Sequence, residues 1–186
     1  MPMLPEAIWR RRLEAEHAEL LAAGEKFDCP GGSSSGSGGG NGDFATYTVS
    51  LRGPALYKNG GKLNRRDSHS VQIALKREYP YAGGIEVVWL TPIFHPNIHP
   101  GDGKVCIQLL NEWSESQSVL SLVKALRQLL VQPNPYNALD KEAADFFADR
   151  PEDVRRVLGI DLKSFEAAPK PLKPKIVGRG ESKRGS

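Results

Sequence analysis

Three runs of alternating apolar and polar residues follow one another in the first half of the chain, and they constrain the fold more than any other feature. Their apolar positions are Tyr47, Val49 and Leu51, then Val71, Ile73 and Leu75, then Ile85, Val87 and Trp89. Successive side chains of a strand point to opposite faces, so each run predicts a strand with one buried face. Asn59-Gly60-Gly61 accepts the positive φ of a hairpin turn, and Gly83-Gly84 separates the second run from the third. The sequence therefore predicts an antiparallel meander.

A helical pattern precedes the predicted meander. A helix is expected over residues 5–23, because Pro5 suits a first turn, Gly24 is a natural stop, and Trp9, Leu13 and Leu20 recur at helical spacing.

More helices are predicted after the meander. Apolar residues recur at helical spacing from Val119 to Leu130, a serine at 116 or 118 can cap this helix, and Pro133 ends it. Shorter helices are expected over 141–148 and 151–158. Helices that cover one face of an antiparallel sheet make an α+β fold.

Composition predicts one domain with two additions. The expected core is 1–167, with a flexible Gly/Ser-rich loop at 31–42 and a basic tail at 168–186 that has a net charge of +5. The tail accounts for the pI of 8.9, and basic residues there are not interleaved with aromatic ones, which argues against nucleic-acid binding. No apolar run reaches about 18 residues, so we expect no membrane span. The N-terminus has no export signal pattern and the chain has only two cysteines, so we expect a cytoplasmic protein.

Residues 91–117 follow neither the apolar period of a strand nor that of a helix. They also contain several side chains that can bind metals or act in catalysis. His95, His99, Asp102 and Cys106 have side chains of the types that bind zinc, but Pro96 and Pro100 exclude a helix that would align the two histidines. A single intracellular cysteine such as Cys106 is often a small buried hydrophobe. It is also a possible nucleophile, although an ordinary thiol is only slightly ionised at neutral pH.

Five short motifs follow one another along the chain. They are Tyr79-Pro80, Phe94-His95-Pro96-Asn97-Ile98, Gly103-Lys104-Val105-Cys106-Ile107, Trp113-Ser114 and Pro133-Asn134-Pro135. In this order the motifs resemble those of ubiquitin-conjugating enzymes, from about Phe44 to Phe147. The resemblance implies an N-terminal helix, a four-stranded antiparallel meander and C-terminal helices, with the fourth strand near Phe94-His95. It implies no metal and no other cofactor.

The resemblance also implies an activity. Cys106 would take a ubiquitin-like modifier from an activating enzyme as a thioester and pass it to a lysine of a protein substrate. Asn97 would donate a hydrogen bond to the oxyanion or hold the loop that shapes the site. His95, Pro96, Asn137 and Trp113 would support the site.

Partner surfaces follow from the same resemblance. A RING-type ligase would bind Tyr81 in one loop and Ser114, Glu115 and Ser116 in another. The activating enzyme would engage Arg10, Arg11 and Arg12, for which a solvated helix face is the simpler interpretation.

The chain departs from the family pattern at several places. Gly83-Gly84 replaces a Pro-Pro pair and is expected to loosen its loop, and Cys106 follows Asn97 by nine residues where eight is commoner. Tyr136 and Asn137 stand where a carboxylate commonly helps the incoming lysine lose its proton. These departures suggest a divergent member of the family. A prokaryotic modifier system is one of the origins that would fit them. The alternative function is a non-catalytic variant that binds a modifier as an interaction module.

Overall fold

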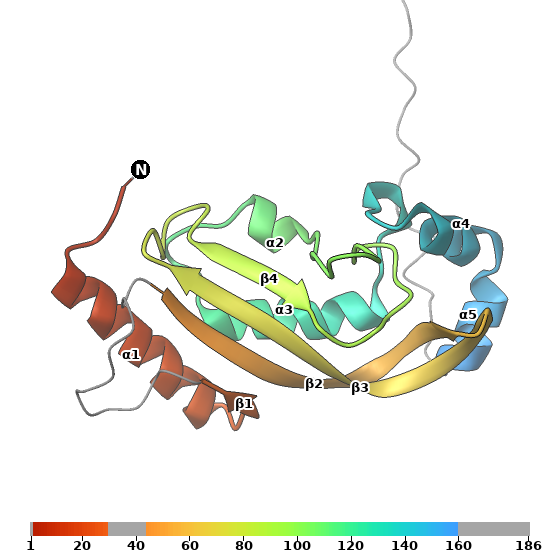
Figure 1. Cartoon of the computed structure of the whole chain (residues 1–186), viewed down its shortest axis with the longest axis horizontal. Helices are drawn as coiled ribbons and strands as arrows, with labels where there is room; N and C mark the ends of the chain where they lie inside the picture. Colours follow the sequence, from red (N-terminus) through yellow and green to blue (C-terminus); the bar gives the residue numbers. More distant parts are fainter. Residues whose placement is uncertain (1, 30–43, 160–186) are drawn as a thin grey trace, which may run out of the picture.

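The computed structural model describes residues 2–29 and 44–159, so the predicted Gly/Ser-rich loop and basic tail lie outside the described residues. The elements in order are α1 (Glu6–Ala22), β1 (Phe27–Asp28), β2 (Phe44–Asn59), β3 (Lys62–Lys76), β4 (Ile85–Trp89), α2 (Gln108–Asn111), α3 (Val119–Val131), a 3-10 turn (Pro135–Asn137), α4 (Lys141–Asp149) and α5 (Pro151–Leu158). Figure 1 shows α1 at one end of the sheet and α4 and α5 at the other.

The sheet confirms the predicted meander. Its order is β1-β2-β3-β4, and the pairs are antiparallel. The predicted inward positions face one another, since Tyr47 pairs with Ile73 and Ile73 pairs with Val87. Gly60 and Gly61 form the hairpin turn with φ of 56° and 78°, which a residue with a Cβ adopts only at a cost.

Strands β2 and β3 extend well beyond the runs that predicted them. A bulge lies between Arg52 and Ala55, after which pairing resumes as far as Asn59 and Lys62. The bulge breaks the two-residue period, so alternation alone could not reveal the outer half of the hairpin. At the bulge, a Cβ on Gly53 would lie 2.8 Å from Leu130 Cδ1, so the missing side chain lets the strand approach α3.

The fourth strand is not where the resemblance placed it. Phe27–Asp28 pairs with Val49 and Thr48 at the edge of the sheet. Phe94 makes only an isolated bridge, through its N–H to the carbonyl of Leu56 at 2.7 Å. Pro92 and Pro96 flank this bridge and have no N–H to continue a ladder, so a strand near Phe94-His95 was wrong.

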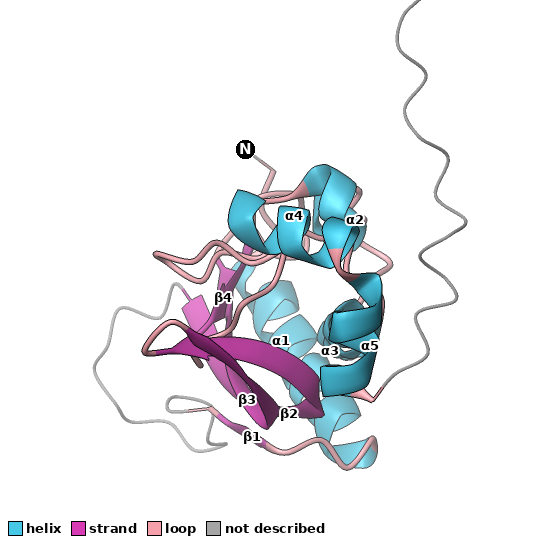
Figure 2. Cartoon of the chain, turned by 90° about the vertical axis from the view of Figure 1, so that its right-hand side faces the viewer, coloured by secondary structure: helices cyan, strands magenta, loops and turns pink. Residues whose placement is uncertain are grey.

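Helix α3 covers one face of the sheet, as Figure 2 shows with the strands on the left and α3 and α5 on the right. Its inward side chains are fully or nearly fully buried, and each buried leucine contributes about 1.5–3 kcal/mol. Ser118 caps the helix by accepting from Ser121 N, which confirms one of the two predicted caps. No helix in the described ranges combines the length and apolar character needed to cross a membrane.

A second, smaller core supports the far end of the hairpin. Leu56 and Phe94 pack there against Phe147, Val154 and Leu158 of α4 and α5. This core fixes the chain just before His95, where the candidate site begins.

Candidate active site around Cys106

Cys106 lies at the mouth of a cleft between the end of the irregular stretch and α3. Its backbone N–H donates to the carbonyl of Asn97 at 2.9 Å, and its side chain is half-buried. The cleft has a volume of about 540 Å³ and reaches from Asn137 and Gln108 to Gln132 near the end of α3. The thiol is therefore held by the backbone while it remains accessible.

The turn at residues 95–97 joins two separate segments to the segment that contains Cys106. The His95 ring bonds the Leu129 carbonyl at 3.1 Å, and the Pro96 carbonyl accepts from the N–H groups of Leu139 and Asp140 at 2.8 and 3.0 Å. This turn thus connects the end of α3 and the start of α4 to the reactive segment.

His95 is a neutral side chain with a defined tautomer. Its Nδ1 accepts from the Asn97 N–H at 3.1 Å, so Nε2 carries the proton and donates to Leu129. Burial lowers the pKa of His95 from 6.5 to about 4, against the opposing effect of the Leu129 hydrogen bond. His95 is 2% exposed and has both nitrogens engaged, so it supports the turn and is not placed as a base.

The two amides of the site have different surroundings. Asn97 is 2% exposed, and its Nδ2 donates to the carbonyls of Asn134 and Asn137 at 2.8 and 3.1 Å. Its Oδ1 accepts from Asn134 N at 2.7 Å. Asn137 is exposed, and its Nδ2 lies 3.7 Å from Cys106 Sγ. Both N–H groups of Asn97 are therefore used to shape the turn, whereas Asn137 presents an amide to the thiol.

The predicted ligase-binding residues lie together on a different surface. Trp113 is buried and donates through Nε1 to the Pro80 carbonyl at 2.9 Å, which joins the Tyr81 loop to the exposed segment Ser114–Ser116. Ser114 Oγ and Ser116 Oγ are 2.9 Å apart. Two loops that are distant in sequence thus form one surface.

Gly84 tightens the Tyr81 loop, contrary to the expectation that Gly83-Gly84 would loosen it. A Cβ on Gly84 would lie 2.2 Å from Tyr79 N, so only glycine fits against that backbone. Gly84 N also donates to the Tyr81 carbonyl at 3.0 Å, and its own carbonyl accepts from Lys76 N at 2.8 Å.

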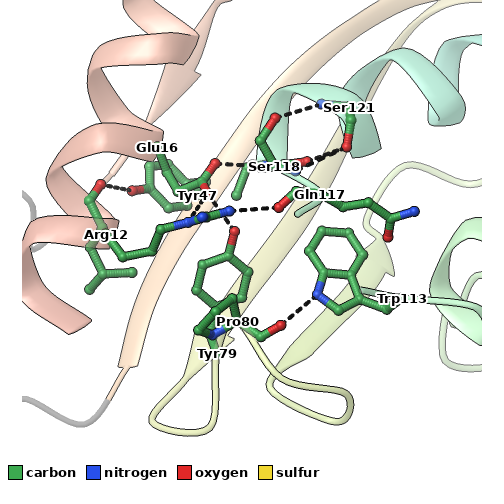
Figure 3. Close-up of polar contacts among 11 residues, drawn as sticks. Arg12, Glu16, Tyr47, Tyr79, Pro80, Trp113, Gln117, Ser118 and Ser121 are labelled. Atoms are coloured by element: carbon green, nitrogen blue, oxygen red, sulfur yellow. Dashed lines mark hydrogen bonds and ion pairs between the residues drawn. The ribbon is translucent and has the colours of Figure 1, made fainter. Parts of the chain in front are cut away.

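Glu16 connects α1 to the Tyr79 loop and to the start of α3, and sequence reasoning missed it. The carboxylate is 2% exposed; Oε1 accepts from the Tyr79 hydroxyl at 2.6 Å, and Oε2 accepts from Val119 N at 2.7 Å. Figure 3 shows these contacts converging from α1, the Tyr79 loop and the start of α3. Burial, followed by the Glu16 hydrogen bond, raises the pKa of Tyr79, so the phenol stays protonated and donates. Position 16 continues the apolar stripe of α1, which is the signal that could have revealed it.

The three arginines of α1 are not equivalent. Arg12 Nε donates to Glu16 at 2.7 Å, and its Nη2 donates to the Gln117 carbonyl at 2.7 Å, so Arg12 is part of the fold (Figure 3). Arg10 is exposed and pairs with Glu6 one turn earlier, and Arg11 is exposed. Arg10 and Arg11 are therefore the two that a partner could reach.

Metal ligation has no support among the described residues. Within 2–29 and 44–159, no group of three or more His, Cys, Asp or Glu side chains is arranged to hold a metal. Of the residues weighed for it, His99 lies 2.8 Å from Asp102, whose other oxygen lies 3.2 Å from Lys104 Nζ.

The buried His95 predicts a loss of stability in acid. A histidine whose folded pKa is lowered stabilises the fold above its unfolded pKa of 6.5, and this contribution is lost as the pH falls towards about 4. Between about pH 7.5 and about pH 4.5, it should remove about 2–3 kcal/mol from the free energy of unfolding. Urea denaturation of the wild type and His95→Gln checks this, because the variant should lose less over the same interval. Equal losses would contradict it.

The Glu16 contacts predict a large cost for removing that carboxylate. Glu16→Ala leaves the Tyr79 hydroxyl and Val119 N–H buried without their acceptor and Arg12 without its counter-charge. The free energy of unfolding should fall by about 3–5 kcal/mol in chemical denaturation. Glu14→Ala, an exposed glutamate of the same helix, is the control and should change it by less than about 0.5 kcal/mol. Similar losses in the two variants would show that the network is not stabilising.

Comparisons with known proteins agree with this geometry. The family profile described as "Ubiquitin-conjugating enzyme" matches residues 48–158. "Ubiquitin-conjugating enzyme E2 6" of Arabidopsis thaliana is 29% identical over 141 residues, which are 74% of this chain and 69% of that protein. "Ubiquitin conjugating enzyme E2 B" of Dictyostelium discoideum is 33% identical over 78 residues, 42% of this chain and 52% of that protein.

The fold has solved counterparts as well. The structure "S. cerevisiae Ubc12" aligns with a TM-score of 0.62 and 28% identity, covering 83% of this chain and 80% of that one. The chain spans about half to two thirds of the length of the curated relatives it matches. The covered share is 52% for the Dictyostelium discoideum protein, 69% for the Arabidopsis thaliana protein and 47% for "Ubiquitin-conjugating enzyme E2 S-A" of Xenopus laevis. From the profile match and the shared fold, the chain belongs to the ubiquitin-conjugating enzyme family.

Proposed function

We propose that this chain accepts a ubiquitin-like modifier as a thioester on Cys106 from an activating enzyme and transfers it to a lysine of a protein substrate. The observation that carries the proposal is the contact between Cys106 Sγ and Asn137 Nδ2 at 3.7 Å, on an open cleft of about 540 Å³. An accessible sulfur beside an amide donor suits a thiolate nucleophile.

The first step is thiol exchange. The Cys106 thiolate attacks the carbonyl carbon of the thioester held by the activating enzyme, the old C–S bond breaks, and the departing thiolate takes up a proton. This step needs access and negative charge on sulfur. A donor near Sγ stabilises that charge, and the Asn97 carbonyl, which accepts from Cys106 N, holds the backbone in place.

The second step is aminolysis. The lysine nitrogen attacks the thioester carbonyl, and negative charge develops on the carbonyl oxygen before the C–S bond breaks. Of the two roles considered for Asn97, the geometry favours holding the loop, because its N–H groups are donated to Asn134 and Asn137. Asn137 is in contact with the sulfur through its amide and is the candidate donor to the oxyanion.

The partner surfaces belong to the same proposal. A RING-type ligase would contact Tyr81 and the exposed segment Ser114–Ser116, which Trp113 joins through Pro80. The activating enzyme would contact Arg10 and Arg11 on α1, since Arg12 is engaged with Glu16 and Gln117.

A charging assay tests the first step. The protein is mixed with ATP, modifier and activating enzyme from its own source, then separated without reductant. We expect an adduct of modifier size that thiol removes and that is absent in Cys106→Ser, where a thiol-resistant oxyester can form instead. Cys29→Ser, which alters a half-buried cysteine at the end of β1, is the matched control and should still be charged.

One outcome would overturn the proposal. If the wild type forms no adduct while the same activating enzyme and modifier charge another conjugating enzyme, then Cys106 is not an acceptor. The non-catalytic modifier-binding alternative would then be favoured.

A further inference from the structure

The proposed transfer to lysine leaves one proton without an assigned acceptor. A lysine side chain has an ordinary pKa of about 10.4, so it is protonated at neutral pH and must lose a proton to react. Tyr136 and Asn137 follow Pro135, where the family commonly has a carboxylate, and neither is an acid. Since Asn137 Nδ2 points at Cys106 Sγ, it donates where an acceptor is needed.

The lining of the Cys106 cleft contains a single carboxylate. Most of its polar side chains are carboxamides, among them Asn137, Gln108 and Gln132, and Glu112 is the one acid that lines it in the described part of the chain. A carboxamide is too weak a base to take a proton from an ammonium group, whereas a carboxylate can accept one transiently during a reaction. Glu112 therefore has a chemical property that its neighbours in the cleft lack.

The fold places Glu112 on the same cleft as the thiol. One short helix, α2, separates it from Cys106, and its backbone N–H donates to the Gln108 carbonyl at 2.9 Å. Gln108 Nε2 donates to Glu112 Oε1 at 2.9 Å, which orients the carboxylate. The next residue, Trp113, is buried and bonded to Pro80, so the chain is anchored on both sides. A carboxylate has about four lone-pair sites, which leaves Glu112 able to contact an ammonium group as well.

Neighbouring acids are committed elsewhere. Asp140 is buried, and its Oδ1 caps α4 by accepting from Ala143 N at 3.0 Å. Asp102 contacts His99 and Lys104 at the tip of the loop before Cys106. Glu115 is exposed on the candidate ligase surface and does not line the cleft.

We propose that Glu112 accepts the proton of the incoming lysine during aminolysis, an inference that rests on the proposed function. The Glu112 carboxylate takes one proton from the lysine ammonium group, which frees the nitrogen lone pair to attack the thioester carbonyl carbon. The C–S bond then breaks with its electron pair on Cys106 Sγ, and this thiolate or water takes up the second proton, which the bonded nitrogen loses. The proton on Glu112 is released to water. Gln108 acts as a positioning residue that orients the carboxylate.

Single-turnover discharge of the charged enzyme tests this step. Wild type, Glu112→Gln and the control Glu14→Gln, which alters an exposed glutamate of α1 outside the cleft, are charged, and the activating enzyme is stopped. Loss of the adduct is then followed with free lysine or with hydroxylamine. Hydroxylamine is largely unprotonated at neutral pH, so it needs no base to free its nitrogen lone pair. We expect Glu112→Gln to react with lysine about 10–100-fold more slowly than the wild type at about pH 7. General-base catalysis typically accelerates a reaction by about 10²–10⁴-fold, so the expected loss lies at or below the lower end of that range.

The same variant should react with hydroxylamine at the wild-type rate, and its deficit with lysine should shrink as the pH rises towards the pKa of lysine. Glu14→Gln should match the wild type throughout. If Glu112→Gln reacts with lysine at the wild-type rate, the inference is overturned. It is also overturned if the variant is slowed equally with both nucleophiles at every pH, because a residue with a merely structural role would have that effect. Charging is measured before any nucleophile is added, so a wild type that forms no adduct shows that the proposed function has failed, and this inference with it.

Discussion

The turn His95–Asn97 is the constraint on which the rest of the site depends. Its hydrogen bonds reach the end of α3 through Leu129, the start of α4 through Pro96, and the backbone of Cys106 through the Asn97 carbonyl. Each such bond contributes about 1 kcal/mol, but leaving a buried partner unpaired costs about 1–3 kcal/mol. The segments are thus fixed relative to one another before any ligand binds, which is what a preorganised site requires.

In this arrangement the buried polar groups hold the loops together, and the exposed polar groups face the cleft. The buried His95 is neutral and Asn97 has its N–H groups occupied, so both residues hold the loops. The groups free to meet a substrate are at the rim, where Asn137 faces the sulfur and Glu112 lines the cleft. At the other end of the molecule, Glu16 plays a similar structural role, because it binds both the Tyr79 loop and the start of α3.

Periodicity predicted the elements that are long and regular, and it failed where contacts are short or nonlocal. Alternation located three strands, but β1 has only two residues and the bulge at Gly53 interrupts the period of β2. The motif order identified Cys106 and Asn97 as neighbours. It could not say which way the Asn97 amide points, because its partners lie 37 and 40 residues later in the chain. The burial of Glu16 was not predicted, because its partners Tyr79 and Val119 lie 63 and 103 residues later in the chain.

The central claim is that Asn97 acts through the turn that places Asn137 beside the thiol. A double-mutant cycle on discharge of the Cys106 thioester to lysine tests it, using Asn97→Ala, Asn137→Ala and the double variant, each first shown to charge. If Asn97 acts through Asn137, each single change should slow discharge by about 10²-fold, and the double variant should be little slower than either. Independent effects that multiply to roughly 10⁴-fold would contradict the claim, and would indicate that Asn97 contacts the oxyanion itself.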